Sequence, residues 1–130
     1  MIEMELSRII IDEAKKEQVI VLKEKGGQRA LPIVIGMNEV TAIKMTLGGF
    51  RSPRPLSHDL MLSIVEVLGV KLEKVVIDNL IEGVFHAKLY ISNKDTMLKI
   101  VDARPSDGIA LAVRAKAPIF VHSQVFDKLS

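Results

Sequence analysis

Apolar and polar residues alternate at the start of the chain, and this pattern restricts the fold more than any other feature of the sequence. Ile2, Met4 and Leu6 are each followed by a glutamate or a serine. A period of two predicts a β-strand with one buried face. Gly26-Gly27 can take the positive φ values of a tight hairpin turn, so we expect the chain to open with antiparallel strands.

Similar patterns continue to the end of the chain and define the order of the elements. Apolar stretches predict strands at residues 2–11, 19–22, 29–35, 70–77, 84–91, 97–101 and 119–121. Apolar residues at helical spacing predict helices at residues 38–47, 57–68 and 105–117 and a short helix at 124–129. The order is β-β-β-α-α-β-β-β-α-β with a short C-terminal helix. Because hairpins outnumber βαβ crossovers, we expect an α+β fold with a mainly antiparallel sheet.

Several local features of these elements are also predictable. The nearly continuous apolar stretch 29–35 indicates a strand covered on both faces, and Pro32 favours a sheet edge or a bulge there. Asn38 and Ser57 are suited to cap the first two helices, and Pro105 to open the third. The expected apolar face of the first helix comprises Val40, Ile43 and Leu47. That of the second comprises Leu60, Met61, Ile64, Val65 and Leu68.

Length and composition predict one globular domain over residues 1–130. A chain of 130 residues without a linker fits a single domain, and an aromatic content of 4% without Trp predicts an aliphatic core. The net charge of +2 comes from mixed charges, which argues against a basic stripe for nucleic acid. The absence of cysteine excludes disulfides, thiolate metal sites and a cysteine nucleophile.

The N-terminal residues and the apolar stretches indicate the compartment. The first residues contain glutamates where a signal peptide needs basic residues, and no stretch approaches the ~18 apolar residues of a membrane span. We therefore expect a cytoplasmic protein without a membrane partner.

Two short polar runs, residues 51–59 and 102–107, contain the concentrated polar chemistry of the chain. Each has an Arg-Pro step, then a hydroxyl residue and an aspartate, at the expected start of a helix. A helix N-terminus attracts anions, phosphate among them. Arg54 and Arg104 lie just before these termini, and arginine can grip two phosphate oxygens at once. The prolines beside both arginines restrict the backbone and would aim the side chains.

The acids and the histidine of the two runs predict a hydrolytic site. Asp59, Asp102 and Asp107 can hold Mg²⁺ or Mn²⁺ if the fold brings them together. His58 can act as a general acid or base, because its ordinary pKa lies near neutrality. We therefore interpret His58 and the three aspartates as candidate catalytic residues of a phosphodiesterase-like site. This hypothesis requires the two runs to meet in one pocket.

A structural interpretation of the same residues stays open. A carboxylate in the first turn of a helix is stabilising for electrostatic reasons alone, so Asp59 and Asp107 can be simple caps. Asp102 can pair with Arg104 or cap the third helix. The arginines can belong to buried ion pairs.

Four segments of the chain resemble the bifunctional nuclease domain family. They are residues 31–36, 53–60, 102–112 and 117–121. They occur in the family's order, and the resemblance extends over nearly the whole chain. Ser57 and Gly108 stand where the family often has Thr and Ala. The first change keeps a capping hydroxyl, whereas Gly108 costs about 1 kcal/mol of helix stability against alanine.

The resemblance implies an α+β domain that self-associates as a homodimer or a higher homo-oligomer, with nuclease activity on DNA or RNA. It implies no settled mechanism. The residues that match motif positions are Arg54, His58, Asp59, Asp102, Arg104 and Asp107. Our first hypothesis is a nuclease that hydrolyses phosphodiester bonds, with assistance from Mg²⁺ or Mn²⁺. The alternative is a non-enzymatic module that forms oligomers or binds an anion.

Overall fold

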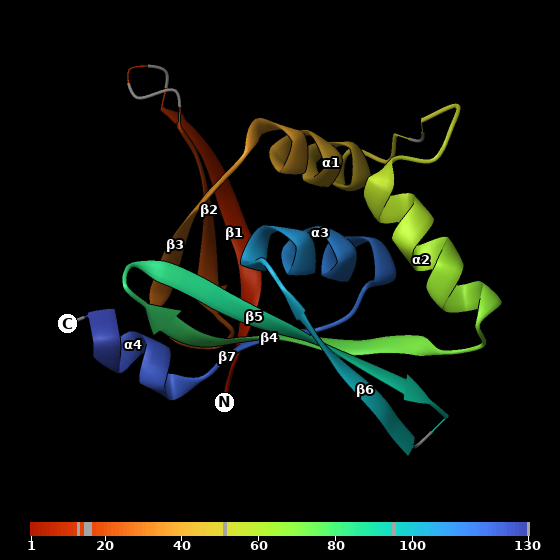
Figure 1. The fold of residues 1–130 in the computed structure, drawn as a ribbon. Helices are drawn as coiled ribbons and strands as arrows, with labels where there is room; N and C mark the ends of the chain where they lie inside the picture. The colour runs from red at the N-terminus through yellow and green to blue at the C-terminus, as the bar shows by residue number, and fades with distance from the viewer. Residues whose placement is uncertain (13, 15–16, 51, 95, 130) are drawn as a thin grey trace.

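A computed structural model describes residues 1–12, 14, 17–50, 52–94 and 96–129. Among these residues, seven strands form one sheet in the order β3-β2-β1-β7-β4-β5-β6, accompanied by four helices (Figure 1). The strands are β1 (Ile2–Asp12), β2 (Glu17–Glu24), β3 (Ala30–Ile35), β4 (Lys71–Ile81), β5 (Val84–Asn93), β6 (Thr96–Ala103) and β7 (Ile119–Val121). The helices are α1 (Met37–Leu47), α2 (Ser57–Val67), α3 (Pro105–Ala115) and α4 (Ser123–Leu129).

The sheet consists of two three-stranded antiparallel meanders joined by β7. The first meander is β1-β2-β3 and the second is β4-β5-β6. β7 pairs antiparallel with β1 and parallel with β4. The predictions of an α+β fold and of a mainly antiparallel sheet are therefore confirmed.

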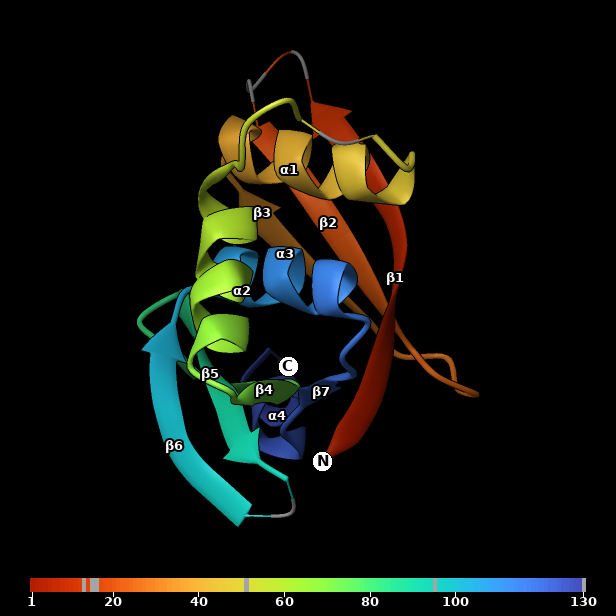
Figure 2. The same ribbon diagram turned by 90° about the vertical axis from the view of Figure 1, so that its right-hand side faces the viewer.

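Helix α3 lies at the centre of the domain and contacts α1, α2, β4 and β5 (Figure 2). Helix α4 lies on the side of β4 and β7 that faces away from α3 (Figures 1 and 2). Aliphatic side chains form the core, as the low aromatic content predicts. No helix in the described part of the chain combines the length and apolar character needed to cross a membrane.

A glycine lets α3 approach the sheet closely. Helix α3 begins at Pro105, as predicted, and Arg104 is its N-cap. A Cβ atom on Gly108 would lie 2.6 Å from Cγ1 of Val75 in β4. Because real Cβ atoms do not approach carbon this closely, a larger residue here would force Val75 or the helix to shift. Gly108 therefore reflects tight contact with β4 rather than local looseness.

Strand β3 is covered on one face only, contrary to the prediction. Its residues alternate between exposed and buried, and Val34 is 61% exposed. Leu31, Ile33 and Ile35 lie on the one face of the strand that contributes to the core. The prediction that Pro32 marks a sheet edge is confirmed, since β2 is the only strand of the described residues that pairs with β3.

Both predicted helix caps are wrong by one or two residues. The N-caps of α1 and α2 are Gly36 and Leu56, both in extended conformation, instead of Asn38 and Ser57. At α2, the Asp59 carboxylate accepts a hydrogen bond from the Leu56 backbone N–H at 3.1 Å. This bond fixes the start of the helix one residue earlier than the serine hydroxyl would.

The predicted apolar face of α2 points largely to solvent. The exposed fractions are 54% for Leu60, 51% for Ile64 and 70% for Leu68, and His58 is the buried residue of the helix. Leu62 packs against the core instead. The helical spacing correctly indicates an apolar stripe, but the contacts of α2 with α3 and β4 use another face. In α1, Val40 and Ile43 are buried as predicted, whereas Leu47 is exposed.

We predict that Gly108→Ala destabilises the domain by about 1 kcal/mol. Overpacking against Val75 costs about 1–3 kcal/mol, and the better helix propensity of alanine offsets about 1 kcal/mol of that cost. Urea unfolding of Gly108→Ala in the wild-type and Val75→Ala backgrounds measures the coupling. In the Val75→Ala background the same substitution should be neutral or stabilising. Equal effects in both backgrounds would show that this contact does not limit the packing of α3.

Candidate functional site

The first turns of α2 and α3 bring residues of the two polar runs together. Nε2 of His58 in α2 lies 3.2 Å from Oδ1 of Asp107 in α3, although the residues are 49 positions apart in the sequence. The side chains of His58 and Asp107 are 9% and 20% exposed. The fold thus places a carboxylate against one nitrogen of a nearly buried imidazole.

Arg104 extends this contact to a third helix. Its Nε and Nη2 atoms donate hydrogen bonds to Asp107 at 2.8 and 2.9 Å. Nη2 also donates to Oε1 of Glu39 in α1 at 3.0 Å. We call His58, Asp107, Arg104 and Glu39 the histidine–aspartate network. Nothing in the sequence distinguishes Glu39, because an acid in the first turn of a helix has an ordinary electrostatic explanation.

The network keeps Asp107 ionised. The hydrogen bonds from the Arg104 guanidinium hold the pKa of the Asp107 carboxyl below its usual value, and His58 acts in the same direction, while partial burial opposes them. An ionised carboxylate can only accept hydrogen bonds, so Nε2 of His58 is the protonated nitrogen. When the ring is neutral, Nδ1 is then the atom that can accept a proton.

Asp59 faces a different cation from its neighbour His58. Its Oδ1 accepts a hydrogen bond from Nε of Arg114 at 2.6 Å, and Arg114 is 8% exposed. This hydrogen bond lowers the pKa of the Asp59 carboxyl, and the Leu56 N–H contributes in the same direction. The sequence offers no signal for Arg114, since a basic residue in the last turn of a helix is commonplace.

Arg54 lies in a hollow between α1 and α2. The hollow measures about 780 Å³. Asp59 and Arg114 also line it, and Arg54 forms no ion pair with a described residue. Arg51, the first residue of the polar run, lies outside the described residues. The lining comprises Met45, Thr46, Gly49, Phe50, Ser52, Pro53, Arg54, Pro55, Leu56, Asp59, Leu62, Ser63, Glu66 and Arg114.

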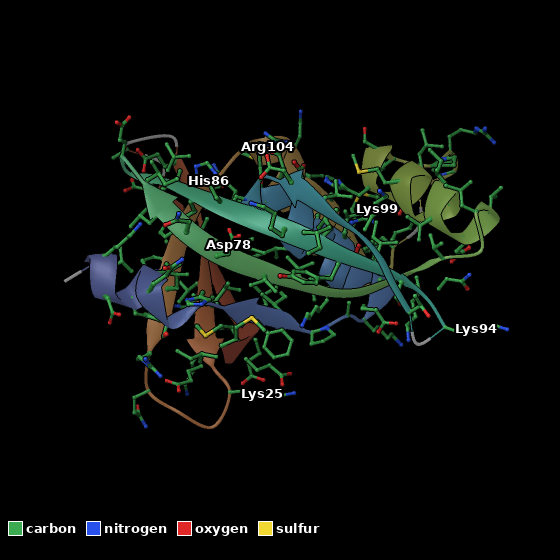
Figure 3. The ribbon with its side chains drawn as sticks, turned by 60° about the horizontal axis from the view of Figure 1, so that its bottom comes forward. Lys25, Asp78, His86, Lys94, Lys99 and Arg104 are labelled. Atoms are coloured by element: carbon green, nitrogen blue, oxygen red, sulfur yellow. The ribbon has the colours of Figure 1, made fainter. Side chains whose placement is uncertain are left out.

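Asp102 is directed away from the histidine–aspartate network. Its Oδ1 lies 3.1 Å from Nζ of Lys88, which also contacts Asp78 at 3.4 Å. The next pair along the strands, Ala87 and Ala103, alternates to the face under α3, where Ala87 is fully buried. Asp102 therefore lies on the opposite face of the sheet. Figure 3 looks onto this face, with Asp78 in front of β4 and β5 and α3 behind them.

The three aspartates do not form the joint metal site that the sequence suggests. Asp59, Asp102 and Asp107 contact Arg114, Lys88 and Arg104, respectively. Within the described ranges, no group of three or more histidine or acidic side chains is placed to hold a metal ion. The carboxylates of Asp59, Asp102 and Asp107 therefore do not fit a shared Mg²⁺ or Mn²⁺. A dependence of activity on either metal stays a prediction.

Comparisons with known proteins agree with the resemblance in the motifs. Residues 20–130 match the bifunctional nuclease domain family. The chain is 40% identical over 123 residues to an uncharacterized protein of Mycobacterium tuberculosis strain H37Rv, covering 95% of this chain and 73% of that protein. It is 26% identical over 117 residues to bifunctional nuclease 1 of Oryza sativa subsp. japonica, covering 88% of this chain and 35% of the rice protein. Bifunctional nuclease 2 of Arabidopsis thaliana is 30% identical over 106 residues, or 79% of this chain and 32% of its own length.

We predict that Asp107→Asn lowers the free energy of unfolding at neutral pH by about 2 kcal/mol, because it weakens charge-assisted hydrogen bonds. The pKa of Asp107 is depressed in the folded state, so its stabilisation is present above the unfolded pKa of about 3.9 and is lost as pH falls through the folded pKa. Wild type and variant should therefore converge below about pH 4.

Urea unfolding between acid and neutral pH tests this expectation. Asp102→Asn is the matched control, since the Asp102 side chain is 76% exposed and should change stability little. A constant difference between wild type and Asp107→Asn at all pH values would contradict the assignment.

Proposed function

The chain belongs to the bifunctional nuclease domain family, and from this premise we propose that it hydrolyses phosphodiester bonds of DNA or RNA. The relatives named as nucleases are plant proteins of which the chain spans about a third. The proposal therefore needs support from the residues of this chain. The observation that carries it is the contact between His58 and Asp107.

His58 has the surroundings of a general base. The Asp107 carboxylate holds Nε2–H, which orients the ring and leaves Nδ1 free of hydrogen bonds to the described residues. An imidazole with this tautomer can take a proton from a water molecule that attacks phosphorus. The imidazolium that forms is stabilised by the adjacent carboxylate. General acid–base catalysis of this kind contributes about 10²–10⁴-fold to a rate.

Arg104 can hold the phosphate next to this base. Its Nε and Nη2 atoms contact Asp107 and Glu39, whereas Nη1 makes no hydrogen bond with the described residues. The side chain is 67% exposed, so a phosphate oxygen can reach Nη1. Charge-assisted hydrogen bonds to a developing phosphorane oxygen stabilise the transition state. In this scheme Asp107 and Glu39 are positioning residues.

The hydrolytic step conserves atoms and charge. Water oxygen forms a bond to phosphorus, and its proton passes to Nδ1 of His58. The bond between phosphorus and the leaving oxygen breaks, and that oxygen takes a proton from the imidazolium or from solvent. We assign no step to Mg²⁺ or Mn²⁺, since no cluster of described side chains fits either ion. The assay below tests whether the ions assist cleavage.

A non-enzymatic oligomeric module is the second candidate. The specific observation that favours it is the exposed apolar surface of α2, where Val67 is 85% and Leu68 is 70% exposed. Large apolar side chains gathered on one helix commonly mark an interface. We propose a second copy of the chain as the partner, in agreement with the self-association that the family resemblance implies. The histidine–aspartate network would then serve to tie α1, α2 and α3 together.

We predict that His58→Gln and Asp107→Asn each lower the cleavage rate of single-stranded DNA or RNA by about 100-fold or more, because each disables the general base. The measurement is a fluorescence-quench assay on protein free of contaminating nuclease, with Mg²⁺, with Mn²⁺ and with chelator. Asp102→Asn, on the opposite face of the sheet, is the control and should keep the wild-type rate within about twofold.

Circular dichroism must show that all three variants are folded. Folded His58→Gln and Asp107→Asn proteins that cleave as fast as wild type would exclude this site. Cleavage that is lost only in Asp102→Asn would move the site to the other face of the sheet.

We predict that the double variant Val67→Lys/Leu68→Lys shifts the protein from oligomer to monomer, because two buried charges at an interface are costly. Light scattering coupled to gel filtration measures the mass. Val34→Lys is the control. It places a charge on the exposed face of β3 and should leave the mass unchanged. A wild-type protein that is already monomeric, or a double variant with the wild-type mass, would contradict self-association through α2.

A further inference from the structure

The hollow beside the start of α2 contains a second group of charged side chains, separate from the histidine–aspartate network. Its lining comes mainly from the second half of α1, the segment that follows it and α2. Arg54 and Arg114 line it, whereas His58, Asp107 and Arg104 do not. Its volume of about 780 Å³ is within the range of pockets that take small organic ligands.

Arg114 lines this hollow and carries a buried donor that lacks a partner among the described residues. Its side chain is 8% exposed, and Nε donates to Asp59. The buried Nη1 atom has no hydrogen-bond partner among the residues that the structure describes. A buried guanidinium N–H without an acceptor is costly, and the cost is removed when an oxygen of a bound anion accepts its hydrogen bond.

Leu56, the N-cap of α2, and Arg54 both line the hollow, so the positive end of the helix and an arginine lie beside it. The N-cap Leu56 has no side-chain acceptor, and Asp59 satisfies the Leu56 N–H alone. The N–H groups of the first turn of this eleven-residue helix therefore lack a side-chain cap. Arg54 stands two residues before the N-cap, exposed and without an ion pair to any described residue. Helix termini of this kind, together with arginine, favour phosphate.

Two acidic side chains, Asp59 and Glu66, also line the hollow and could repel an anion. Both oxygens of Asp59 are engaged, by Arg114 and by the Leu56 N–H. Glu66 lies two helical turns further along α2, about 10 Å from the level of Asp59. The donors gathered at the start of α2 are therefore not neutralised by a free carboxylate beside them.

Apolar side chains line the rest of the hollow. Met45, Phe50 and Leu62 contribute to it, and Phe50 is 72% exposed. An accessible ring of this kind can stack on a nucleobase. We propose that the hollow binds one nucleotide, with its phosphate at Arg54, Arg114 and the first turn of α2, and its base against Phe50. The site holds a ligand without breaking a bond, so it goes beyond the hydrolysis proposed above.

Isothermal titration calorimetry with AMP tests the site, with adenosine as the probe that lacks phosphate. Wild type should bind AMP at least tenfold more tightly than adenosine. Arg54→Gln should weaken AMP binding at least tenfold, and Arg8→Gln, which removes the same charge from β1, should not. Arg114→Lys keeps the charge and the pair with Asp59 but removes the planar donor, and should weaken AMP binding as well. Because Arg54 is exposed, its variant tests the proposal even if Arg114→Lys does not fold.

Short oligonucleotides with and without a 5′-phosphate distinguish a free nucleotide from the end of a strand. Binding of AMP alone assigns the site to nucleotides, and binding of AMP and of the phosphorylated strand assigns it to terminal phosphates; both support the proposal.

Equal affinity for AMP and adenosine, or an Arg54→Gln variant that binds AMP like wild type, would overturn it. His58→Gln should keep the AMP affinity, so loss of cleavage with retained binding separates this site from the hydrolytic one.

Discussion

The close packing of α3 against β4 and β5 is the constraint on which the rest of the structure depends. Gly108 lets the helix axis approach the sheet, and the residues from Gly108 to Ala112 are buried without interruption. α1 and α2 then pack on α3 more than on the sheet. The position of α3 therefore sets the places of Arg104 and Asp107 at its start and of Arg114 near its end. Both candidate sites are attached to this one helix.

Pairing of charges divides the polar residues into separate groups. Asp107, Asp59 and Asp102 each contact a different basic residue, and these contacts point in different directions. His58 and Asp59 are adjacent in the sequence but belong to different groups, because neighbouring positions on a helix face different sides. In a chain with a net charge of +2, the two proposed phosphate sites thus depend on two local groups of donors.

Much of the fold could be predicted from the sequence, and parts of the site could not. The period of two locates the strands, Pro32 the sheet edge and Pro105 the start of α3, because these signals are local. The apolar stripe of α2 is visible in the sequence, but what covers it depends on tertiary contacts that periodicity does not contain. Asp102 shares its chemistry with Asp59 and Asp107, but strand alternation directs its side chain to the other face of the sheet. Glu39 and Arg114 have ordinary positions in their helices, so nothing in the sequence separates them from surface charges.

The short strand β7 has a consequence for the order in which the molecule can assemble. β1 and β4 do not pair with each other among the described residues; β7 lies between them, pairing Val121 with Ile2 and Ile119 with Val75. Contacts between residues so far apart in sequence close late, because of the loop entropy that they cost. During synthesis on the ribosome, the two meanders therefore stay unjoined by β7 until residues 119–121 have left the exit tunnel.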